Sequence, residues 1–230
     1  MSEITSPIAP SSDPGRTAGV LSLVLAPVFL AAGTAVVPSA VGERHGTDRA
    51  KSLQVLVDAA PDRARLPVAA LLLALGLGLL VPAATAIART APRRTTRWGS
   101  WLVVVGTPMA VVANVVGLDL LFRVTASDVP RTSGVDVLAG GHDPAVLVAS
   151  ALYLLVPVGF VLLGIGLWRS HVVGRLAAAL VGVGPVVALA APEGWAGALA
   201  TAPFLVGLVL VARRQRPALV AAHEPMVAAS

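Results

Sequence analysis

The chain has 230 residues, of which 56% are hydrophobic and only 13% are charged. A soluble domain normally carries about twice that charge, so the composition excludes an ordinary water-soluble protein and indicates a membrane protein. The absence of cysteine excludes disulfides, thiolate metal sites and thiol redox chemistry. The net charge of +5 lies in short segments between apolar runs, so we expect the lipid bilayer as the main partner, and no nucleic acid.

Six apolar runs follow one another along the chain, and each approaches the roughly 20 residues that a helix needs to cross a bilayer. Because lipid offers no hydrogen-bond partner for backbone groups, such runs must be helical. The fifth run is the weakest of the six, since Arg175 lies just inside its first edge. The sequence therefore predicts an all-α fold, a polytopic transmembrane helical bundle of six helices, with spans at about 18–41, 66–88, 101–122, 145–168, 172–191 and 195–212.

The segments outside the spans predict the orientation. The short loop RTAPRRTTR after the second span contains four Arg and no acidic residue, whereas most carboxylates fall on the opposite side. Because basic residues concentrate in cytoplasmic loops, we expect both termini to lie in the cytoplasm, in a bacterial inner membrane. The amino-terminal tail, 1–17, and the basic carboxy-terminal tail, 213–230, lack apolar periodicity and are expected to be mostly disordered.

The first outer segment predicts a short helix. Between residues 47 and 60, apolar residues recur at the spacing of one helix face, and Pro61 ends the pattern. The residues of this face are Leu53, Leu56, Val57 and Ala60. We interpret the segment as an amphipathic helix lying on the membrane surface, and leave open the alternative of a lid over a cavity.

The second outer segment is rich in glycine and carries several possible metal ligands. They are Asp128, Asp136, His142 and Asp143. Their spacing matches neither an EF-hand nor any zinc pattern. We therefore expect a solvated loop and no bound metal.

Small residues recur at four-residue spacing in four of the spans, where they stack on one helix face. They are Ala70, Ala74 and Gly78, then Gly106 and Ala110, then Ala178 and Gly182, then Gly197 and Thr201. Such faces let helix backbones approach closely, which drives much of helix association in lipid. Pro108 and Pro157 stand near the middle of their spans and predict kinks there.

One apolar stretch of the third span, VVANVVGLDLLFRV, carries three polar residues, Asn114, Asp119 and Arg123. Asn114 follows Ala110 by four residues on the small-residue face, so we expect its amide to bond a neighbouring helix. Asp119 and Arg123 are also four residues apart, and their depth predicts an ion pair near the outer boundary. The alternative is that these residues form a buried site for a substrate or a proton.

The spans carry little reactive chemistry. All four His fall in loops or tails, so no span offers the paired ligands of haem or of an intramembrane metal. Neither HExxH nor Gly-x-Ser-x-Gly occurs, and there is no phosphate-binding Gly-rich loop. We therefore predict no enzyme activity and no cofactor. The four Trp stand at span ends, as membrane-interface anchors do.

An amphipathic stretch runs into the second span as SLQVLVDAAPDRARLPVAALLLALG, a basic turn follows, and the fourth span ends in VGFVLLGIGLWRSHVVGRLAAAL. In this order the chain, from Ala18 to Ala191, resembles a broad family of uncharacterised bacterial multi-pass integral membrane proteins, a domain of unknown function. The resemblance implies the architecture and transfers no activity, cofactor or catalytic residue.

Two functions remain as hypotheses. The first is a non-catalytic protein that packs with itself, as a homo-oligomer, or with a membrane-protein partner; its small-residue faces motivate it. The alternative is a small transporter or permeability factor for an unidentified solute, motivated by Pro108, Asn114, Pro157 and the outer segment as a lid. A lipid-modifying enzyme would need a carboxylate or His within the hydrocarbon, and none is clearly there.

Overall fold

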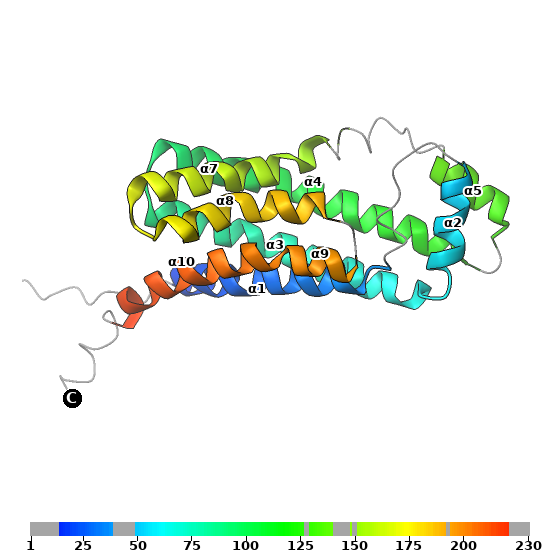
Figure 1. Cartoon of the computed structure of the whole chain (residues 1–230), viewed down its shortest axis with the longest axis horizontal. Coiled ribbons are helices and arrows are strands. Elements are labelled where there is room, and N and C mark those ends of the chain that lie inside the picture. Colours follow the sequence, from blue (N-terminus) through cyan, green and yellow to red (C-terminus); the bar gives the residue numbers. More distant parts are fainter. Residues whose placement is uncertain are drawn as a thin grey trace, which may run out of the picture.

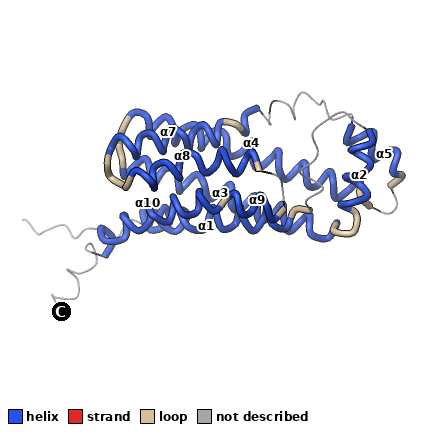
Figure 2. Tube along the Cα trace, in the orientation of Figure 1, coloured by secondary structure: helices blue, strands red, loops and turns tan. Residues whose placement is uncertain are grey.

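The computed structural model describes residues 14–38, 49–126, 129–139, 148, 151–191 and 194–220. Within these ranges the chain is helical and contains no strand, which confirms the all-α prediction (Figure 2). The elements are α1 (Pro14–Val36), α2 (Arg49–Ala59), the 3-10 turn η2 (Arg63–Arg65), α3 (Leu66–Thr90), α4 (Arg94–Val124), α5 (Arg131–Ala139), α7 (Leu155–Ser170), α8 (Arg175–Ala190), α9 (Trp195–Ala200) and α10 (Ala202–Val220).

The long helices form a closed ring. α1, α3, α4, α7, α8 and α10 each pack against the next along the chain, and α9 and α10 return to pack against α1. Figure 1 shows these helices along the long axis of the molecule, with α2 and α5 beyond one end. In the same view α1 begins and α10 ends at the opposite end of the bundle.

Five helical segments are long and apolar enough to cross a membrane, which indicates a membrane protein. They are Thr17–Val36, Arg63–Thr90, Arg94–Val124, Ala151–Ser170 and Trp195–Gln215. The fifth predicted span is the exception, because α8 has only 16 residues. Arg175 begins this helix instead of lying inside it, so the predicted number of six spanning helices is not confirmed.

Both predicted tails are shorter than expected. α1 already begins at Pro14, and α10 continues past Arg213 and Arg214 to Val220. The amide of Gln215 donates a hydrogen bond to the Thr90 hydroxyl at 2.6 Å, which fastens this end of α10 to α3. The rest of the two tails, residues 39–41 of the first predicted span and residues 145–147 and 149–150 of the fourth lie outside the described residues.

Most buried apolar side chains pack in one core along the ring, and a second core lies at the α2 and α5 end. In the main core Phe160 of α7 and Phe204 of α10 are buried and meet edge to face, with ring centroids 4.9 Å apart. The second core, which we call the end core, joins α2 to the extended ends of α3 and α4. Its buried members are Val37, Val55, Leu56, Ala59, Leu66, Ala69, Leu118, Leu121, Val124 and Val135.

Glycines allow the ring helices to approach one another closely. A Cβ atom added at Gly99 of α4 would lie 2.6 Å from the Gly159 carbonyl oxygen of α7, and one added at Gly159 would lie 2.7 Å from the Gly99 oxygen. At the next crossing, a Cβ at Gly164 would meet the Ala178 oxygen of α8 at 2.7 Å. The helices are therefore in backbone contact, as the small residues predict.

The predicted small-residue faces are confirmed in three spans and partly wrong in the second. The small residues of the third, fifth and sixth spans are buried, namely Gly106, Ala110, Ala178, Gly182, Gly197 and Thr201. In α3, however, Gly78 is exposed and an added Cβ would have nothing within 4 Å. Gly76 packs in its place, against Leu30 of α1.

Of the two predicted kinks, one stands at a helix interior and the other does not. Pro108 lies inside α4, where it deprives a carbonyl one turn earlier of its hydrogen bond. Pro157 is the third residue of α7 and follows a turn at Leu154, which separates α7 from the helical residues 151–153; proline cannot donate to the carbonyl four residues earlier, which is consistent with a break at this point. The sixth predicted span is instead broken at Thr201, between α9 and α10.

Candidate functional site

Asn114 satisfies its side chain within its own helix. Its Nδ2 donates to the Ala110 carbonyl oxygen at 2.8 Å, and the side chain is part-buried. Among the described residues it has no hydrogen bond to a neighbouring helix, so that prediction is not confirmed. A short polar side chain reaches the carbonyl four residues earlier, and this local bond forms without help from another element.

Asp119 and Arg123 form the predicted ion pair. The Arg123 Nε lies 2.8 Å from the Asp119 Oδ2, and the two side chains are 74% and 50% exposed respectively. An exposed pair of this spacing stabilises a helix by about 0.3–0.5 kcal/mol. Neither residue lies in the core, so the structure does not join them with Asn114 in one buried site.

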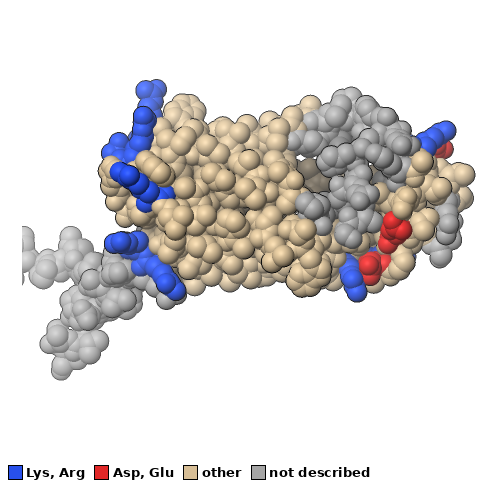
Figure 3. Space-filling model, in the orientation of Figure 1, with Lys and Arg blue, Asp and Glu red and all other residues tan. Residues whose placement is uncertain are grey.

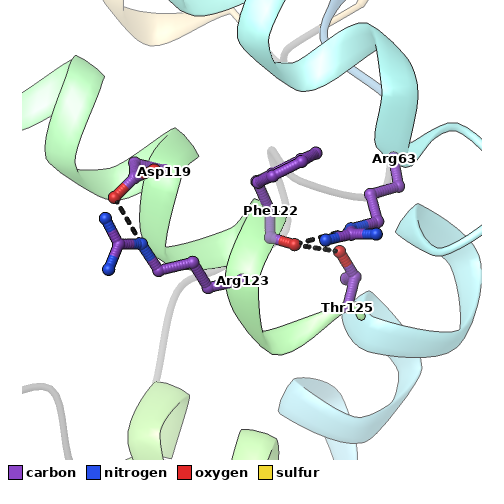
Figure 4. A network of polar contacts seen from close by, with 5 residues as sticks. All are labelled: Arg63, Asp119, Phe122, Arg123 and Thr125. Carbon is purple, nitrogen blue, oxygen red and sulfur yellow. Dashed lines mark hydrogen bonds and ion pairs between the residues drawn. The ribbon is translucent and has the colours of Figure 1, made fainter. Parts of the chain in front are cut away.

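A second polar group occupies the other side of the same helix end. Arg63 of η2 donates from Nε to the Phe122 carbonyl oxygen at 2.8 Å, and its guanidinium lies 4.1 Å from the centroid of the Phe122 ring. The Thr125 hydroxyl donates to the carbonyl oxygens of Leu121 and Phe122. Figure 4 shows Asp119 and Arg123 pointing away from Arg63.

These contacts close the last turn of α4, whose final carbonyls lack partners within the helix. A cation over an aromatic ring adds about 0.5–1 kcal/mol at an exposed site. Arg63 therefore has a structural role, joining the start of α3 to the end of α4. Arg63 falls between two predicted spans, and no local sequence motif reveals its partner 59 residues away.

The outer amphipathic segment forms helix α2, but its buried face differs from the predicted one. Val55, Leu56 and Ala59 are buried in the end core, whereas Leu53 and Val57 are 41% and 43% exposed. The helix packs against protein, so the residues that face α4 and α5 become the buried ones. α2 therefore packs on the end of the bundle, and its position at a membrane surface stays a prediction.

The second outer segment is partly helical, where an irregular loop was expected. α5 packs against α2. Arg49 of α2 forms an ion pair with Asp136 of α5 and donates a hydrogen bond to its carboxylate. The other three possible ligands, Asp128, His142 and Asp143, lie outside the described residues. Within the described ranges no group of three or more His, Cys, Asp or Glu could hold a metal ion.

Charged side chains separate between the two ends of the bundle (Figure 3). The end where α1 begins carries basic residues, and the described part of the chain places no acidic residue there. These are Arg89, Arg93, Arg94, Arg97, Arg169, Arg175, Arg213 and Arg214, which we call the arginine end. At the α2 and α5 end the described Arg residues are mixed with Asp58, Asp62, Asp119 and Asp136.

A groove of about 360 Å³ lies between α7 and α8. Gly164, Ala178 and Gly182 form its floor, and Ile165 and Val183 rise beside it with exposures of 43% and 57%. Trp168 and Arg169 stand where the groove reaches the arginine end. The position of Trp168 at a span end predicts an interface anchor, and the structure places it beside the small residues of α8 in the same groove.

No protein-family model matches the chain, and neither a curated protein nor a solved structure matches it. The resemblance to an uncharacterised bacterial family therefore stays a prediction. The fold itself defines the class: a helical membrane protein whose helices are in close backbone contact.

Proposed function

We propose that the chain is a non-catalytic multi-pass protein of a bacterial inner membrane that acts by packing its helices against a second copy or another membrane protein. The observation that carries this proposal is the outward face of α3. Gly78 stands there with open space in front of it, whereas a Cβ added at Gly76 of the same helix would meet Leu30 of α1. In lipid, such an open glycine lets another helix approach closely.

Two large apolar side chains precede this glycine on the same face of α3. Leu71 and Leu75 are 61% and 45% exposed, and they precede Gly78 by seven and three residues, one face of a helix. An incoming helix would pack against these leucines and cross at Gly78. This face, Leu71, Leu75 and Gly78, is the α3 docking face.

Because the chain contains no cysteine, single cysteines can test the α3 docking face in native membranes. We expect Gly78→Cys to form a disulfide-linked dimer under mild oxidation, since a glycine at a helix crossing brings two backbones together. Val105→Cys is the matched control, because Val105 is 44% exposed on α4. If the partner is another membrane protein and not a second copy, a photo-crosslinking residue at position 78 should capture that protein.

Gly78→Val should abolish capture by a crosslinker at position 75 without lowering the melting temperature, because a Cβ added at this position has no atom of another element within 4 Å. A chain that stays monomeric and uncrosslinked at both positions in native membranes would refute packing as its mode of action.

We further propose that all six ring helices cross the bilayer and that the arginine end is cytoplasmic. α8 is about 24 Å long by helix geometry, and local thinning and snorkelling of Arg175 accommodate a helix shorter than the hydrocarbon. Its packing between α7 and α10 supports its crossing with them. The concentration of arginines at one end of the described bundle supports the orientation.

Single cysteines also test this topology. We expect Asp58→Cys and Trp195→Cys to react with an impermeant maleimide in intact cells, and His171→Cys to react only after the membrane is opened. Position 195 decides whether α8 crosses, because His171 and Trp195 lie at its two ends. Labelling of positions 171 and 195 from the same side would leave five crossings and place the two termini on opposite sides.

A small transporter or permeability factor remains the second candidate, and one observation favours it. Thr107 is 3% exposed beside Pro108 of α4, and its hydroxyl has no hydrogen-bond partner among the described residues. A buried unsatisfied hydroxyl at such depth is costly unless a second conformation or a solute satisfies it. Solute flux through vesicles containing the purified protein separates this candidate from packing alone.

A further inference from the structure

The groove between α7 and α8 has the shape of a site for one hydrocarbon chain. Its lining is apolar apart from Arg169, and its floor is made of small residues that leave space between two helices. The outer walls include Ile165 and Val186, which are 43% and 44% exposed toward the surface of the bundle. The groove therefore opens sideways, toward lipid in the proposed membrane orientation.

The depth of the groove matches one leaflet. Along α7 it extends from Arg169 back to Val161, and along α8 it reaches Val186, eleven residues beyond Arg175. At about 1.5 Å per residue these lengths are roughly 12 and 16 Å, close to half of the ~30 Å hydrocarbon thickness. A chain lying in the groove would end near the middle of the bilayer.

The mouth of the groove is cationic and aromatic. Arg169 lines it, and the guanidinium of Arg175 lies 5.8 Å from the centroid of the Trp168 ring. Both arginines are exposed, and no carboxylate among the described residues shares the arginine end. Arginine binds phosphate through several N–H donors at once, and Trp is typical of the headgroup level.

We propose that the groove binds one anionic phospholipid of the leaflet at the arginine end, with an acyl chain between α7 and α8 and the phosphate at Arg169 and Arg175. This inference rests on the proposed membrane location. The lipid would be a ligand in addition to the proposed packing partner. The positive charge of Arg169 and Arg175 at the mouth of the groove favours an anionic over a zwitterionic headgroup.

Trp168 provides the measurement, because it lies in the groove wall. A protein with Trp98→Phe, Trp101→Phe and Trp195→Phe keeps Trp168 as its single tryptophan. The replaced residues are all exposed, at 59%, 66% and 77%, so the fold should survive. This parent protein is placed in phosphatidylcholine vesicles containing a rising fraction of chain-brominated phosphatidylglycerol or, separately, chain-brominated phosphatidylcholine, and quenching of its fluorescence is recorded.

We expect half-maximal quenching at an about thirtyfold lower fraction of the anionic lipid, the ratio that ~1 kcal/mol from each of Arg169 and Arg175 gives. Arg169→Gln should lower this preference to about fivefold, and Arg213→Gln, which removes the same charge at the same end, should retain it in full. Arg169 is chosen over Arg175 because Arg175 contacts the reporter ring. Ala179→Phe, which fills the groove, should remove the preference, whereas Leu176→Phe, outside the groove lining, should not.

Equal quenching by the two lipids in the parent protein would overturn the site. An equal loss of preference in Arg169→Gln and Arg213→Gln would also overturn it, because general surface attraction would then explain the binding. If neither lipid quenches Trp168 in protein that still floats with the vesicles, the site would also be overturned, because another helix would then fill the groove in place of an acyl chain. Protein that does not float with vesicles would refute the membrane location itself, a separate outcome.

Discussion

Gly99→Val is expected to lower the melting temperature of the detergent-solubilised protein by about 6–12 °C. The new Cβ would lie 2.6 Å from the Gly159 oxygen and 2.9 Å from the Leu163 backbone nitrogen of α7. These are backbone atoms, so relief requires moving α4 and α7 apart. Overpacking of this kind costs up to about 3 kcal/mol, which corresponds to that shift for a chain of this size.

Gly78→Val is the matched control, because it makes the same chemical change in a neighbouring long helix. Nothing lies within 4 Å of its added Cβ, and valine is at least as good a helix former as glycine. We expect the monomer to melt within about 2 °C of the parent. Equal destabilisation by the two variants would mean that α4 and α7 are not in backbone contact.

Much of the architecture could be predicted because lipid leaves an apolar segment little choice but a helix. The spans around α3 and α4 are correctly located, since uncharged runs bounded by charges mark a bilayer crossing. The fifth span shows the limit of this reasoning. Hydropathy counts residues 172–174 as apolar, yet His171 has a left-handed backbone (φ 54°) and Gly174 an extended one, so α8 begins only at Arg175.

The candidate polar site was harder to predict, because its outcome depends on which helix face meets which neighbour. The spacing of Asp119 and Arg123 within one helix fixed their pairing without knowledge of other elements. The amide of Asn114, in contrast, can donate either to a carbonyl of its own helix or to one on a neighbouring helix. Residue spacing does not distinguish these two hydrogen bonds, and the structure shows the bond within the helix. The buried face of α2 depended likewise on distant elements: Leu56 packs in the end core, to which α5 and the extended ends of α3 and α4 contribute.

Leu56→Ala is expected to release α2 from the bundle while leaving the ring intact. Leu56 is 4% exposed in the end core, and removing a buried leucine side chain costs about 2 kcal/mol or more. Because the end core is separate from the main core, this loss falls on α2 and α5. Amide hydrogen exchange should therefore rise about 30-fold in α2 and stay unchanged in α7 and α8.

Leu53→Ala, in the same helix, is the control for this variant, since Leu53 is 41% exposed and its loss should change exchange in α2 by less than about threefold. A uniform rise over all helices in Leu56→Ala would contradict the separation of the two cores. If exchange in α2 rises alone, α2 and α5 form an independently opening unit on the ring. Loss of dimer capture at Gly78 in this same variant would then connect the end core to the α3 docking face, through the Leu66 and Ala69 contacts at the start of α3.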